Sequence, residues 1–140
     1  MSEQKATIEK KKYLLRMLFQ AQEAVDKREF SRSKVGAVLF QETFTTNKTA
    51  LSVGVSNRLH APVKALLQFF EDYSYSRYLK GFSMLVTHGP CAPCLTLMHY
   101  VGITKVYYLY DSPTNYKRWG RLLDVYQLAL DGTPIIRSAR

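Results

Sequence analysis

Apolar residues recur at helical spacing near the start of the chain. Between residues 8 and 29 they fall on or beside one stripe, and no proline or glycine interrupts the segment. This spacing predicts a long helix that buries one face. The stripe consists of Tyr13, Met17, Ala21, Ala24 and Val25, with Leu14 and Leu18 beside it.

Short apolar segments later in the chain predict strands. Residues 35–40 form a continuous apolar run, which is typical of a buried strand. A polar stretch at 41–48 suits a hairpin turn into a second strand over 50–55. Further strands are expected over residues 82–87, 105–110 and 133–137.

Three later segments predict helices, over residues 60–72, 91–101 and 118–131. The second is expected to end at Gly102 and the third at Gly132. Helices that alternate with short buried strands predict an α/β fold, a three-layer α-β-α sandwich around one mixed five-stranded sheet. Because we see no internal repeat or linker, residues 1–140 are expected to form a single domain.

The composition agrees with a globular α/β fold, and the net charge indicates which classes of binding partner are favoured. Apolar residues make up 46% and charged residues 22%, which excludes a disordered tail, a collagen-like fibre and a disulfide scaffold. A formal net charge of +9 favours anionic partners such as nucleotides, nucleic acid or an acidic protein surface. No secretory segment or apolar run of membrane-spanning length is present, so we expect a cytoplasmic protein without a membrane partner.

The two cysteines of the chain, Cys91 and Cys94, are three residues apart at the start of a predicted helix. Free N–H groups and the helix dipole favour thiolates there, and thiolate is the form that binds metal. His60, which opens another predicted helix, is the natural third ligand. Three protein ligands leave one position of a tetrahedral zinc ion open, as in catalytic sites. The alternative is a pair of buried thiols and a surface histidine.

Around these residues the sequence resembles the zinc-dependent nucleobase deaminases, whose signature is His-x-Glu followed by Pro-Cys-x-x-Cys. The residues in question are His60-Ala61-Pro62 and Pro90-Cys91-Ala92-Pro93-Cys94. Segments 33–39, 85–91 and 101–108 are similar to those of deoxycytidylate deaminases, including phage-type members. The resemblance implies a cytidine-deaminase-like fold, bound Zn²⁺, a pyrimidine nucleotide such as dCMP as ligand, and an oligomer of identical or different subunits.

The sequence departs from this family at one position, because Pro62 stands where the family has glutamate. In the family that glutamate is not a zinc ligand but moves protons between water, the pyrimidine ring and the leaving ammonia. Proline can neither accept nor donate a proton, and general acid–base groups typically raise the reaction rate by about 10²–10⁴. Proline is nevertheless tolerated in the first turn of a helix. We therefore expect a zinc-binding pseudo-deaminase that retains nucleotide, nucleic-acid or partner binding, like the non-catalytic subunits of tRNA adenosine deaminases, which also lack this glutamate.

Two alternatives stay open. The protein is an active dCMP or cytidine deaminase if another carboxylate, from this chain or a neighbouring subunit, replaces the missing one. Glu71 lies about 16 Å further along the same predicted helix, and Asp111 and Glu42 have no motif to support them. The protein is instead a basic nucleic-acid-binding module if the cations and aromatic rings of residues 116–119, or the N-terminal lysines, contact DNA or RNA.

Three polar residues near the motif have two interpretations each. Asn57 is a candidate substrate-binding residue, because the family often contacts the nucleotide sugar from this loop, but asparagine also favours turns. His88 could be a fourth zinc ligand, although a hydrogen-bonding or packing role is favoured. His99, late in the helix that follows the cysteines, is expected to be a structural or surface residue.

Overall fold

The computed structural model describes residues 2–26, 35–41, 52–55, 60–73, 82–110 and 115–138. Helices and strands alternate along the chain, as the sequence predicts for an α/β fold. None of the helices in these ranges is both long enough and apolar enough to cross a lipid bilayer. The elements are α1 (Ser2–Asp26), β1 (Gly36–Gln41), β2 (Ser52–Val55), α2 (Ala61–Tyr73), β3 (Phe82–His88), α3 (Ala92–Tyr100), β4 (Lys105–Tyr110), the 3₁₀ helix η1 (Tyr116–Trp119), β5 (Asp124–Leu128) and β6 (Pro134–Ile136).

One mixed sheet forms the middle of the molecule, with the strand order β2-β1-β3-β4-β5-β6. β1 runs antiparallel to both β2 and β3, whereas β3, β4 and β5 are mutually parallel and β6 is antiparallel to β5. The carboxyl ends of the parallel strands β3 and β4 therefore lie at the same edge, where His88 pairs with Tyr110. Ligand sites in α/β sheets typically lie outside this edge.

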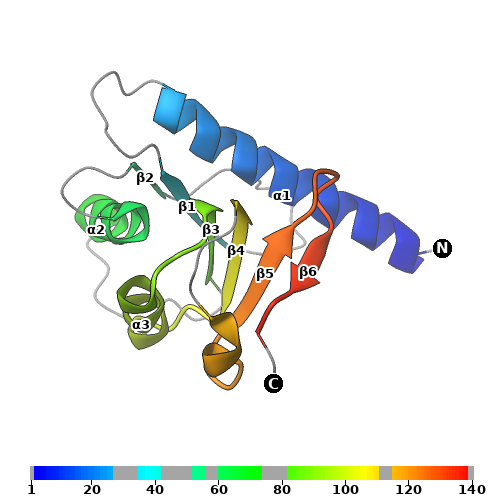
Figure 1. Ribbon diagram of the computed structural model, residues 1–140. Coiled ribbons are helices and arrows are strands. Elements are labelled where there is room, and N and C mark those ends of the chain that lie inside the picture. Colours follow the sequence, from blue (N-terminus) through cyan, green and yellow to red (C-terminus); the bar gives the residue numbers. More distant parts are fainter. Residues whose placement is uncertain are drawn as a thin grey trace.

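Helices cover both faces of the sheet, which confirms the three predicted layers. α1 lies along one face, and α2 and α3 cover the other (Figure 1). Side chains of β1 alternate between the two faces, because Val38 and Phe40 pack under α1 while Ala37 and Leu39 pack under α2 and α3. The α1 core and the α2–α3 core are thus two separate apolar layers.

The helix predicted over 118–131 is wrong. η1 ends at Trp119, and residues 124–128 form β5, which adds a sixth strand to the five that the sequence predicts. Apolar residues here match helical spacing over a short stretch, but the edge of β4 offers a backbone ladder and two apolar faces. Val125 is buried in the α2–α3 core, and the ring of Tyr126 stacks on Tyr107 at 5.3 Å on the α1 face. Tertiary packing therefore overrides the local pattern.

The turn between β5 and β6 is fitted closely against α1. Gly132 has a φ of +88°, and a Cβ added there would lie 2.9 Å from both the Leu15 Cγ and the Lys11 carbonyl oxygen. Lys11 also pairs with Asp131 across this contact at 3.7 Å. Since left-handed backbone is costly for residues other than glycine, we expect Gly132→Ala to lower the free energy of unfolding by about 1–2 kcal/mol or more in urea denaturation.

Leu130→Ala is the matched control for this prediction, because Leu130 lies in the same turn with 93% of its surface exposed. We expect that variant to unfold within about 0.5 kcal/mol of the parent chain. Equal stability of Gly132→Ala and the parent chain would show that α1 does not constrain the turn.

Candidate metal centre

Two helix starts on the same side of the sheet bring the predicted ligands together. His60 immediately precedes α2, and its carbonyl accepts the first helical hydrogen bond, from the Lys64 N–H at 3.0 Å. Cys91 caps α3 in the same way, because its carbonyl accepts from the Leu95 N–H at 3.0 Å. Cys94 then lies one helical turn further along, on the same face as Cys91.

The donor atoms of His60, Cys91 and Cys94, which we call the ligand trio, converge on one point. The His60 Nδ1 lies 3.2 Å from the Cys91 Sγ and 3.3 Å from the Cys94 Sγ, and the two sulfurs are 3.4 Å apart. Tetrahedral zinc with ordinary bond lengths would set these separations at about 3.6–3.8 Å, so a small expansion would accommodate the ion. Within the described ranges, no other group of three histidine, cysteine or acidic side chains gathers as closely. One imidazole and two thiols fit Zn²⁺.

Burial differs sharply among the three side chains. Cys94 is only 3% exposed, Cys91 is half-buried and His60 is exposed, so the trio opens to solvent on the histidine side. Burial raises the pKa of the Cys94 thiol to about 12, and the hydrogen bond and charge of Cys91 add to this effect. Because a thiol must lose its proton to bind metal, metal binding releases protons and its affinity rises with pH.

His88 and His99 do not join the trio. The His88 Nδ1 lies 3.0 Å from the Thr87 Oγ1, and its ring packs against Tyr110 at 4.9 Å. The Thr87 hydroxyl also accepts a hydrogen bond from the Gly36 N–H at 3.0 Å, which ties the end of β3 to β1. His88 thus has the hydrogen-bonding and packing role favoured by the sequence, and His99 is exposed on α3.

Pro62 lies buried in the first turn of α2, two residues after His60. A proline fits there because the first N–H groups of a helix have no partner within it. Glu71 is exposed near the other end of α2 and is not part of the trio. Asn57, Asp111 and Glu42 lie outside the described residues.

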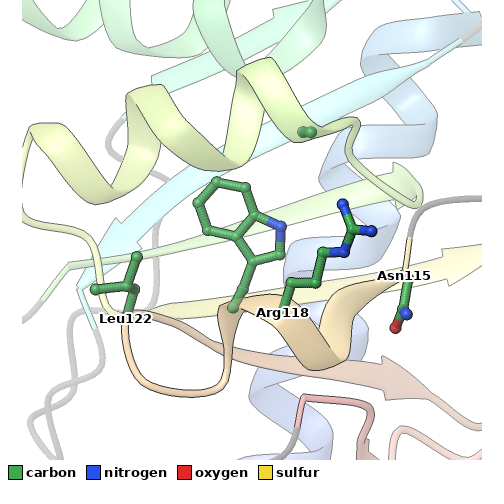
Figure 2. A pocket seen from close by; sticks show the side chains of 5 residues that line it. Asn115, Arg118 and Leu122 are labelled. Carbon is green, nitrogen blue, oxygen red and sulfur yellow. The ribbon is translucent and has the colours of Figure 1, made fainter.

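A pocket of about 430 Å³ lies between Ala92, the first residue of α3, and the segment around η1. The Arg118 side chain extends from η1 toward the start of α3, and Leu122 lies at the other end of the pocket (Figure 2). Of the predicted 116–119 cluster, Arg118 and Trp119 line this pocket, whereas Tyr116 is buried and Lys117 is exposed. The remaining lining residues, which sequence reasoning missed, are Ala92, Asn115 and Leu122.

Solved structures of deaminases are similar to this fold. The dCMP deaminase of cyanophage S-TIM5 in its apo form is 21% identical, with a TM-score of 0.64, and 84% of this chain covers 98% of that chain. Its complex with dCMP and dUMP is 21% identical, with a TM-score of 0.59 and coverage of 79% and 92%. The diaminohydroxyphosphoribosylaminopyrimidine deaminase/5-amino-6-(5-phosphoribosylamino)uracil reductase of Thermotoga maritima is 18% identical, with a TM-score of 0.65 and coverage of 84% and 36%. At these identities the likeness shows the fold.

The family itself is shown by the sequence. Residues 8–110 match the cytidine and deoxycytidylate deaminase zinc-binding region, which is most of the chain and includes all three members of the trio. No curated protein sequence matches the chain. On the family match, together with the converging imidazole and thiols, the chain belongs to the cytidine and deoxycytidylate deaminase family.

Proposed function

We propose that this protein binds zinc and a pyrimidine nucleotide but is strongly impaired as a deaminase. His60, Cys91 and Cys94 would hold the metal, which when bound supplies a Lewis acid able to lower the pKa of a water molecule. The single observation on which the proposal depends is the buried Pro62 in the first turn of α2, beside an otherwise complete ligand trio.

Deamination needs a side chain that moves protons within about 2.6–3.2 Å of the reacting atoms. The Pro62 ring carries no titratable group, and proline also lacks a backbone N–H that could donate a hydrogen bond. Within the described residues no carboxylate joins the His60, Cys91 and Cys94 group. Without the glutamate that the family has at this position, the rate of deamination should be lower by about 10²–10⁴, even if nucleotide binding is intact.

Nucleotide binding is supported by three features. The solved cyanophage relative is a complex with dCMP and dUMP, and this chain has a formal net charge of +9. Arg118 adds a guanidinium to the pocket that is also lined by Ala92, the residue after Cys91, and guanidinium groups recognise phosphate through paired hydrogen bonds. Asn57, which precedes His60 by three residues, is our candidate for contact with the sugar.

The test is to incubate zinc-loaded protein with dCMP and to measure heat of binding and ammonia release in parallel. We expect saturable binding with ammonia release close to that of a protein-free control. Robust release that disappears in Cys91→Ala would overturn the proposal and favour an active deaminase with a carboxylate from elsewhere. Absence of dCMP binding would overturn the nucleotide part of the proposal, and the same titration with single-stranded DNA would then test the nucleic-acid alternative.

A further inference from the structure

We propose that Tyr116 is a positioning residue of the metal centre, which acts by holding the peptide that precedes Cys91. The Tyr116 hydroxyl donates a hydrogen bond to the Pro90 carbonyl at 3.2 Å. This bond joins η1 to the turn between β3 and α3, although the two segments are far apart in the sequence. The inference rests on the proposed role of Cys91 and Cys94 as ligands.

The Tyr116 side chain is itself fixed by its surroundings. It is only 5% exposed, belongs to the α2–α3 core, and packs against the ring of Tyr108 on β4 at 5.1 Å. Pro90 is buried as well, so both partners of the hydrogen bond are shielded from water. Because an unpaired buried carbonyl or hydroxyl is costly, the bond selects one position of the turn.

The position of the Pro90 carbonyl constrains the backbone from which the Cys91 side chain departs. That carbonyl belongs to the planar peptide joining Pro90 to Cys91, so holding its oxygen limits rotation of the plane from which the Cys91 Cα–Cβ bond departs. On the other side, the Cys91 carbonyl accepts from the Leu95 N–H at 3.0 Å. With both neighbouring peptides held, rotation about the Cα–Cβ bond is the main freedom left to the Cys91 sulfur.

A third bond completes the support of this turn. The Gly89 N–H donates to the Tyr110 carbonyl at the end of β4, at 2.8 Å. This bond and the Leu95 bond join backbone groups, whereas the Tyr116 bond comes from a side chain. Substitution can therefore remove the Tyr116 contribution while the other two bonds stay in place. Groups that orient the ligands of a metal typically contribute about 10–100-fold to its affinity.

The experiment compares zinc affinity in Tyr116→Phe and the parent chain by competition with a chromophoric chelator at fixed pH. We expect zinc to bind about tenfold more weakly to Tyr116→Phe, at the lower end of the range for supporting groups. A second readout is the absorption spectrum of the Co²⁺-loaded proteins, whose bands should shift if the Cys91 sulfur is displaced.

Ser138→Ala is the matched control for a purely structural effect. The Ser138 hydroxyl is also buried, accepts from the Val125 N–H at 3.0 Å and donates to the Leu123 carbonyl at 3.1 Å. We expect Ser138→Ala to lower the thermal stability while zinc affinity stays within twofold of the parent chain. Equal weakening of zinc binding in both variants, or unchanged affinity in folded Tyr116→Phe, would overturn the proposal.

Hydrogen exchange of the zinc-free proteins separates this proposal from the proposed function. We expect the Gly89 and Leu95 amides to exchange faster in Tyr116→Phe than in the parent chain, and unchanged exchange would count against the Tyr116 role. If the parent chain fails to bind zinc, the metal centre itself is refuted, whereas the exchange comparison still reports on the turn.

Discussion

Replacing Pro62 with glutamate should give the protein measurable turnover on dCMP. The substitution places a carboxylate two residues after His60, in the first turn of α2. Glutamate forms helices well, and a negative charge near a helix N-terminus is favourable, so α2 should form normally. A general acid–base group at this position should raise ammonia release by about 10²–10⁴ over the parent chain.

Pro62→Gln is the matched control, because glutamine has nearly the same shape as glutamate but cannot exchange a proton at neutral pH. We expect Pro62→Gln to stay at the level of the parent chain, and the double variant with Cys91→Ala to be inactive as well. Ammonia release would be followed with the zinc content and circular dichroism of each protein. A folded, zinc-loaded Pro62→Glu without turnover would show that a glutamate at this position is not sufficient for deamination.

Removing the buried thiol should abolish tight zinc binding. Cys94→Ser takes away one of three converging donor atoms, and we expect the affinity for zinc to fall by about 10³-fold or more. Since a ligand held at about 1,000 times its Kd stabilises the folded state by about 4 kcal/mol, the parent chain should melt at a clearly higher temperature with zinc than with a chelator. In Cys94→Ser this difference should vanish.

His99→Ala is the matched control for Cys94→Ser, because it removes an exposed histidine from the same helix and leaves the three ligands in place. Its melting temperature should respond to zinc as that of the parent chain does. The response of the parent chain should also strengthen as the pH rises from 6 to 8, because binding must displace thiol protons. Identical melting of the parent chain with zinc and with chelator would contradict the metal centre.

Much of the fold and the ligand trio could be predicted, because the signals are local. Helical spacing predicted α1 and α2, and the spacing of Cys91 and Cys94 fixes both sulfurs on one helical face. β5 could not be predicted, because its partner β4 is brought beside it only by the tertiary fold. The same holds for the pocket beside α3, whose walls come from two separate segments of the chain.

Tyr116 illustrates a different limit. In the sequence, Tyr116 stands beside Lys117 and Arg118. An aromatic residue among cations is a pattern that favours contact with nucleic acid. The structure instead buries Tyr116 and exposes Lys117, because η1 turns successive side chains in different directions. A run of four residues contains no information on which of them the core will accept.

The placement of Pro62 has a consequence for the scaffold around it. In the opening turn of a helix, proline removes no backbone hydrogen bond and brings a compatible φ, so exchanging a catalytic carboxylate for it leaves the scaffold intact. Loss of turnover and loss of stability are thus separable at this position. The opening turn of α2 is therefore a position where a single amino-acid replacement could exchange an acid–base group and still keep the architecture around it.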